Sequence, residues 1–135
     1  MQPVTPAAPV AKTKVWAGGI LSGLVILFLV FDGVIKFIKP APVVEAFAQL
    51  GLPLNLSVAI GVVVLACTAL YSIPRTSVLG AILLTGYLGG AVVTHLRVGD
   101  PLFSHVLFPT YVGVLLWAGL YLREDRLRAL LPLRS

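Results

Sequence analysis

Six polar side chains that could bind or transform a ligand stand at the ends of apolar segments in this 135-residue sequence: Asp32, Lys36, His95, Arg97, Asp100 and His105. Asp32 and Lys36 are four residues apart, so on a helix they share one face, with the acid in the more favourable N-terminal position. Ionisable groups within apolar segments are costly to bury and are therefore functional candidates. Two acids, two fixed cations and two histidines predict a polar ligand-binding pocket in which the six residues meet.

The same residues also allow simpler interpretations. Lys36 can extend its ammonium to lipid headgroups while it pairs with Asp32, and Arg97 with Asp100 can form a solvated turn. A third interpretation is catalytic, with His95 or Asp32 transferring a proton in a small enzyme that acts on a lipophilic substrate.

Metal and covalent-cofactor chemistry is not expected. His95, Asp100 and His105 supply ligand atoms that suit zinc or iron, but His105 follows His95 by ten residues across a loop, which is a loose pattern. The sequence has no serine–histidine–acid set, no phosphate-binding loop and no CxxCH haem motif. The one cysteine, Cys67, cannot form an internal disulfide, and we expect it to be a buried packing residue. No catalytic residue and no metal ligand is assigned.

The composition indicates a membrane protein. Hydrophobic residues make up 59% of the chain and charged residues 11%, whereas soluble domains are about 45–50% apolar and about 25% charged. This excludes a soluble globular enzyme, a disordered tail and a nucleic-acid-binding domain. The net charge of +5 is carried by basic residues at the ends of apolar segments, where membrane proteins place them, so no nucleic-acid partner is expected.

Four apolar segments are long enough to be spans: residues 15–38, 54–73, 78–96 and 106–122. The first extends roughly 36 Å as a helix, enough to cross a hydrocarbon core of about 30 Å. It is also longer than the apolar h-region of a signal peptide, so we expect it to be retained as a first span. Residues 43–50 have apolar positions at helical spacing and predict a short interfacial helix between spans one and two. The predicted fold is therefore an all-α integral membrane four-helix bundle, preceded by a flexible tail at 1–14 and followed by a basic tail at 123–135.

Basic residues predict the orientation. With four spans, both termini lie on one side of the membrane. The termini and the second loop hold seven basic residues, and the first and third loops hold three. This excess predicts cytoplasmic termini in a bacterial inner (plasma) membrane.

Small and hydroxylated residues suggest how the helices pack. Gly19 and Gly23, and likewise Gly86 and Gly90, are four residues apart, a spacing that lets membrane helices approach closely.

Thr85, Tyr87 and Thr94 could line a pocket, although a hydroxyl bonded to its own helix backbone is the preferred interpretation. Trp117 is expected to pack within the protein or to face lipid.

The chain resembles the DoxX-like family of small bacterial membrane proteins in four segments, in order and spacing: FDGVIKF (31–37), EAFAQLGLP (45–53), PRTSVLGAILLTGYLGGAVVTHLRVGDPLFSHVLFP (74–109) and WAGLYLREDRLRALLP (117–132). The resemblance covers nearly the whole chain after the N-terminal tail. It implies a four-helix membrane bundle, often a small accessory protein. The family takes its name from a subunit associated with thiosulfate:quinone oxidoreduction, and other members are linked to oxidative-stress or thiol complexes.

The function expected from residues and resemblance together is a non-catalytic subunit that anchors or assists a membrane redox complex. Its outer polar pocket would hold a lipid or a quinone, with a histidine or Lys36 donating to a carbonyl oxygen and Asp32 holding that donor in place. Expected partners are the lipid bilayer, a redox protein and further copies of the chain. The alternatives are a small-solute transporter or channel subunit that works as an oligomer, and the membrane enzyme described above.

Overall fold

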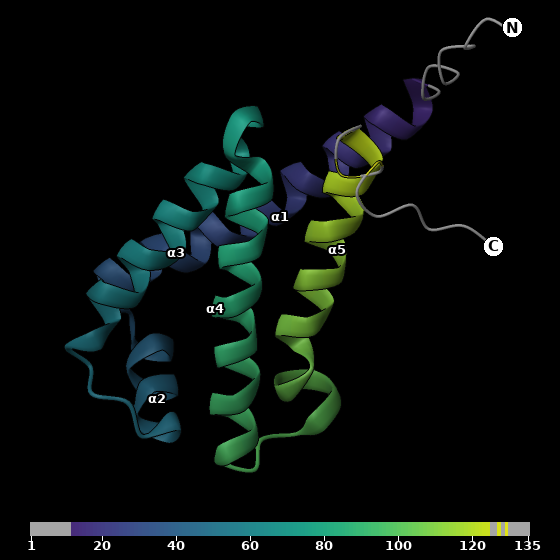
Figure 1. The fold of residues 1–135 in the computed structure, drawn as a ribbon. Helices are drawn as coiled ribbons and strands as arrows, with labels where there is room; N and C mark the ends of the chain where they lie inside the picture. The colour runs from purple at the N-terminus through teal and green to yellow at the C-terminus, as the bar shows by residue number, and fades with distance from the viewer. Residues whose placement is uncertain (1–11, 125–126, 128, 130–135) are drawn as a thin grey trace, which may run out of the picture.

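The computed structural model describes residues 12–124, 127 and 129, which fold into helices joined by short turns, with no strand in this part of the chain (Figure 1). The α-helices are α1 (Lys12–Ile38), α2 (Ala41–Leu50), α3 (Leu56–Ser72), α4 (Ser77–Arg97) and α5 (Phe108–Arg123). A 3₁₀ turn, η1 (Pro74–Thr76), joins α3 to α4, and a π-helical turn, η2 (Leu102–Val106), precedes α5. The all-helical prediction is confirmed.

Three helical segments are long and apolar enough to cross a membrane: Lys12–Ile38, Pro74–Arg97 and Leu102–Arg123. The fourth expected span corresponds to α3, which is apolar but only 17 residues long. Helix α1 begins at Lys12, so residues 12–14 are helical and do not belong to a tail. The rest of the expected N-terminal tail, and most of the expected C-terminal one, lie outside the described residues.

The turns on either side of α2 depend on two left-handed residues. Lys39 has φ 55° and is followed by extended Pro40, which together turn the chain away from α1. Pro42 stands in the first turn of α2, where a missing backbone N–H costs nothing. Gly51 ends the helix at φ 71°, and its N–H bonds the carbonyl of Ala48. The expected short helix is therefore present, two residues longer at its start.

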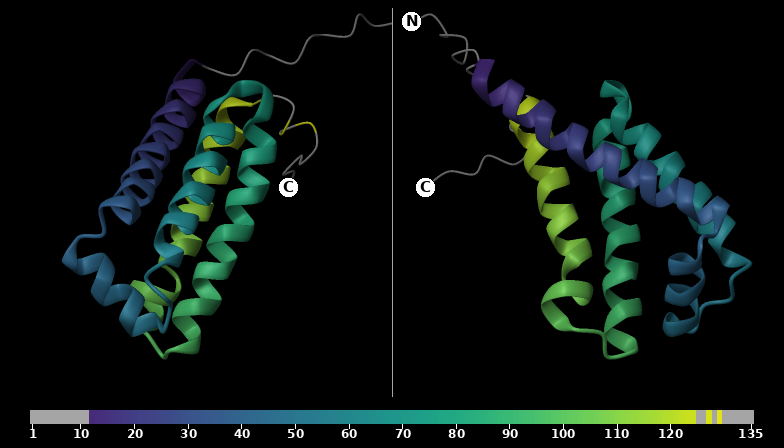
Figure 2. Two further views of the ribbon diagram at one scale, coloured as in Figure 1. Left: turned by 90° about the vertical axis from the view of Figure 1, so that its left-hand side faces the viewer. Right: turned by 180° about the vertical axis from the view of Figure 1, so that it is seen from behind.

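The four longer helices enclose one apolar core. Helix α1 packs against α3 and α5, and α4 packs against the same two helices. Figure 2 shows α1 running obliquely across the others. Fully buried side chains from all four of these helices meet in the centre, among them Leu29, Tyr71, Leu84 and Leu116. Cys67 is buried in this core, as expected.

Glycines permit the closest helix contacts. A β-carbon at Gly18 of α1 would lie 2.8 Å from the carbonyl oxygen of Gly119 of α5. One at Gly61 of α3 would lie 3.0 Å from the carbonyl oxygen of Gly33 of α1. These two crossings fix α1 against its neighbours at positions where no side chain fits.

The glycine pairs singled out in the sequence do not make such contacts. A β-carbon at Gly19, Gly23, Gly86 or Gly90 would meet no atom within 4 Å. The four-residue spacing is therefore present, but these faces of α1 and α4 are not interfaces within the chain.

Candidate functional site

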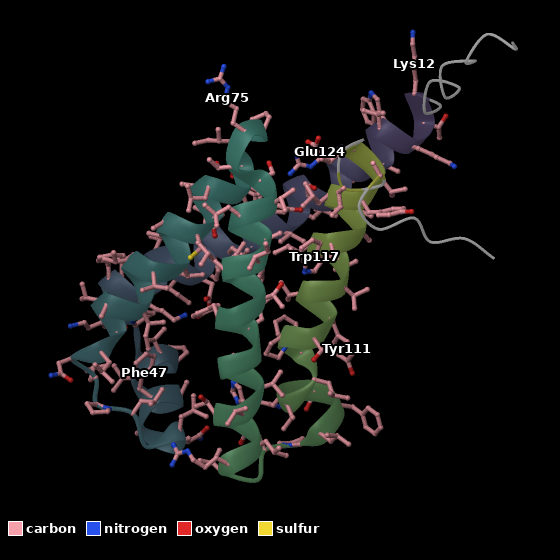
Figure 3. The ribbon with its side chains drawn as sticks, in the orientation of Figure 1. Lys12, Phe47, Arg75, Tyr111, Trp117 and Glu124 are labelled. Carbon is pink, nitrogen blue, oxygen red and sulfur yellow. The ribbon has the colours of Figure 1, made fainter. Side chains whose placement is uncertain are left out.

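A cavity of about 600 Å³ opens between α1, α2 and α4, with further wall residues from α3 and α5. Its walls are mainly apolar. They include Phe28 of α1, Phe47 of α2 and Val112 of α5. Helix α2 lines the cavity with its two buried side chains, Val43 and Phe47, of which Phe47 is labelled in Figure 3. The cavity has the size and apolar character of a small-molecule site.

An ion pair lies on the α1 wall of this cavity. Lys36 Nζ is 2.8 Å from Asp32 Oδ2 and also donates to the Asp32 carbonyl oxygen at 3.3 Å. The side chains retain only 12% and 27% of their exposure, respectively. The backbone at Lys36 is fixed from α3, because Ser57 Oγ donates to its carbonyl oxygen at 2.7 Å. The predicted i, i+4 pairing is thus present, and it is held at a defined place in the wall.

Tyr87 joins this pair from α4. Its side chain lines the cavity and interacts electrostatically with the Asp32 carboxylate. Thr85 and Thr94 instead donate to carbonyl oxygens of their own helix, at 2.7 and 2.8 Å, as preferred from the sequence. Thr94 still borders the cavity. Of the three hydroxyl residues considered from the sequence, Tyr87 is therefore the one whose side chain interacts with the ion pair.

His95 brings a second polar group to the cavity. Its Nδ1 lies 2.6 Å from Asp100 Oδ2, and its ring meets that of His105 edge to face with centroids 6.1 Å apart. His105 Nδ1 is in turn 2.8 Å from Ser104 Oγ. Asp100 and His105 do not line the cavity; they contact His95 from outside it. In the described part of the chain, no set of three metal-ligating side chains is grouped.

Arg97 has a different place from the one expected. Its Nη2 donates to the carbonyl oxygen of Leu50 at the end of α2, and the side chain does not line the cavity. Of the six candidate residues, the structure thus places Asp32, Lys36 and His95 in the cavity wall. The other three support the wall from outside.

A separate polar network lies toward the other end of the helices. The buried Tyr71 hydroxyl donates to the Leu116 carbonyl oxygen at 2.7 Å and lies 3.0 Å from Ser22 Oγ. Arg123 Nε donates to the same Ser22 oxygen, and its guanidinium lies 5.2 Å from the Tyr71 ring centre. This network connects α1, α3 and α5. Arg123 thus makes contacts within the protein, although the sequence analysis counted it only as a basic residue at the cytoplasmic side.

Trp117 combines packing with a polar contact. Its Nε1 donates to Thr85 Oγ1 at 2.7 Å, across a groove between α4 and α5. The packing interpretation of this residue therefore holds, with a hydrogen bond added.

The profile of the DoxX-like family matches residues 20–119, about three quarters of the chain and every residue that lines the cavity. No curated protein and no solved structure matches the chain.

Proposed function

The chain belongs to the DoxX-like family, and we propose that it is a non-catalytic membrane subunit whose α1–α2–α4 cavity binds a lipophilic ligand such as a quinone, in support of a redox complex. One observation carries the ligand-binding part: a cavity of about 600 Å³ with apolar walls is bordered by Asp32, Lys36, Tyr87 and His95. Apolar walls favour a ring or an isoprenoid chain, and a few fixed polar groups orient its head.

The polar groups suit such a head group. Lys36 keeps a donor free after its two contacts with Asp32, because an ammonium has three N–H groups. The Asp32 carboxylate holds that ammonium in position, which is the role expected of Asp32 from the sequence. A carbonyl or hydroxyl oxygen of a ligand would accept the remaining hydrogen bond.

The same proposal places α1, α3, α4 and α5 in the bacterial inner membrane as a four-helix bundle. Apolar exposed side chains around the helices support a lipid environment. The excess of basic residues at the termini and at the α3–α4 turn supports cytoplasmic termini. The cavity would then lie toward the outer leaflet.

Three glycines of α4 provide a test of cavity binding. A β-carbon at Gly86, Gly89 or Gly90 would meet no atom within 4 Å, so leucine can be introduced at each without a clash at that atom. Gly86 and Gly90 line the cavity, whereas Gly89 lines the α4–α5 groove. Gly86→Leu and Gly90→Leu fill the cavity, and Gly89→Leu is the matched control.

The measurement is photolabelling of the full chain in lipid nanodiscs with an azido-benzoquinone, followed by peptide mapping. We expect labelled peptides from α1, α2 and α4, loss of labelling in the two cavity-filling variants, and retained labelling in Gly89→Leu. Equal labelling of all three variants would show that the quinone binds elsewhere. Native mass spectrometry of gently extracted protein tests the accessory role, because a bare homo-oligomer would favour the transporter alternative.

A further inference from the structure

His95 is oriented by a residue outside the cavity. Its Nδ1 is 2.6 Å from Asp100 Oδ2, while the ring itself borders the cavity. A carboxylate can only accept a hydrogen bond, so Nδ1 must be the protonated ring nitrogen. In the neutral imidazole, Nε2 then carries a lone pair and no hydrogen. Within the described residues, Nε2 has no partner, so it is the ring nitrogen available to a ligand.

From this geometry we infer that His95 accepts a hydrogen bond from its ligand, and that the cavity therefore selects ligands with a ring hydroxyl, of the phenol or quinol class, over their carbonyl or ether counterparts. The inference rests on the proposed cavity function and specifies its ligand. It reverses the expected role of the histidine, which was to donate to a carbonyl oxygen. Asp100 is the positioning residue that fixes the ring nitrogen's role.

Lys36 complements this acceptor. It lines the same cavity from α1, whereas His95 lines it from α4, and its ammonium can only donate. A ligand hydroxyl satisfies either group, because a hydroxyl both donates and accepts. A carbonyl satisfies Lys36 alone and would cover the Nε2 lone pair of His95 without offering it a donor, which disfavours binding.

Two redox-inert probes separate these cases: 4-decylphenol and 4-decylanisole, which differ by methylation of the hydroxyl. Their affinities are measured by equilibrium binding to the full chain in nanodiscs. Because partition into lipid differs between the probes, the phenol-to-ether ratio is compared between protein variants. We expect this ratio to fall about threefold to tenfold in His95→Phe, the size of one neutral hydrogen bond.

Asp100→Leu keeps His95 but removes the carboxylate that accepts from its Nδ1. The phenol-to-ether ratio should therefore fall in this variant as well. The matched control is Glu45→Leu, which removes an exposed carboxylate outside the cavity. This variant should keep the wild-type ratio. An unchanged ratio in His95→Phe and Asp100→Leu would overturn the inference, even if both probes bind and the proposed cavity stands.

Nitrogen NMR of isotope-labelled histidine in the wild-type chain gives a second readout that does not depend on the binding of either probe. We expect a protonated Nδ1 and an unprotonated Nε2 for His95, with His105→Phe providing the assignment. A protonated Nε2 would overturn the inference. If neither probe binds to any variant, the proposed cavity function itself fails.

Discussion

Arg97 of α4 donates a hydrogen bond to the carbonyl oxygen of Leu50, the last residue of α2. The last carbonyls of a helix lack intrahelical donors, and a cation there also interacts favourably with the helix dipole. Helix α2 approaches the other helices closely at few points, and left-handed residues stand at Lys39 and Gly51 on either side of it. Arg97 therefore holds the cavity wall that is least supported by packing.

Removal of this contact should loosen α2. In Arg97→Met we expect the amide hydrogens of residues 43–50 to exchange roughly fivefold faster, which corresponds to about 1 kcal/mol for one hydrogen bond. Hydrogen exchange with mass spectrometry measures this. Arg75→Met removes an exposed arginine near the other end of the molecule (Figure 3) and should leave α2 unchanged. Equal exchange in both variants would contradict the role given to Arg97.

Gly80 should tolerate no side chain. A β-carbon there would lie 2.6 Å from Tyr71 Cα, so Gly80→Ala forces α3 and α4 apart and should destabilise the protein by about 3 kcal/mol or more. Gly86→Ala is the control on the same helix, where the added methyl meets open space and should stabilise by up to about 1 kcal/mol. Unfolding in SDS measures both. Similar stability of the two variants would argue against the tight α3–α4 contact.

The buried Tyr71 hydroxyl should contribute more than an exposed one. Tyr71→Phe removes the donor to the Leu116 carbonyl and should cost about 1 kcal/mol. Tyr111→Phe removes a comparable bond, to the Phe103 carbonyl at 2.9 Å, but at an exposed site, so we expect a change below about 0.5 kcal/mol. The free energies of unfolding of the two variants are compared. A larger loss in Tyr111→Phe would contradict the network.

Asp32 and Lys36 should be energetically coupled. In a double-mutant cycle with Asp32→Asn and Lys36→Gln, we expect a coupling of about 1 kcal/mol, above the usual value for exposed pairs because both side chains are largely shielded. A cycle with Glu45→Gln and Arg75→Gln, two exposed charges near opposite ends, should give none. Coupling indistinguishable between the cycles would show that the pair adds no stability.

Cysteine labelling tests the proposed orientation. In a Cys67→Ser background, Ser104→Cys should react with a membrane-impermeant maleimide on intact cells, whereas Arg75→Cys should react only after permeabilisation. Both positions are exposed and lie toward opposite ends of α4. The reverse pattern would place the termini outside. Labelling of both sites on intact cells would contradict a span between them.

Hydropathy and local spacing suffice to predict the helices and the Asp32–Lys36 pair. Apolar segments must satisfy their backbone hydrogen bonds internally, and residues four apart meet on any helix. Topology alone also places His95 and Asp32 at the same end of the molecule. These features depend only on neighbours along the chain or on helix order.

Helix rotation could not be predicted in the same way. Whether Gly86 or Gly80 contacts another helix depends on which face of α4 packs against α3, and the spacing of small residues fits either face. The partner of Arg97 is a carbonyl 47 residues away, which no side-chain pattern reveals. The preference for Tyr87 over Thr85 and Thr94 likewise appears only once α1 and α4 face each other.

The position of α2 at the edge of the cavity has a kinetic consequence. The other four helices that line the cavity belong to the core, but α2 is joined by two short turns and rests on few contacts. Displacement of α2 would thus open the cavity without unfolding the rest of the protein. The residence time of a bound molecule would then follow the opening rate of α2, while its affinity would follow the polar groups on α1 and α4, so that the two quantities can change independently.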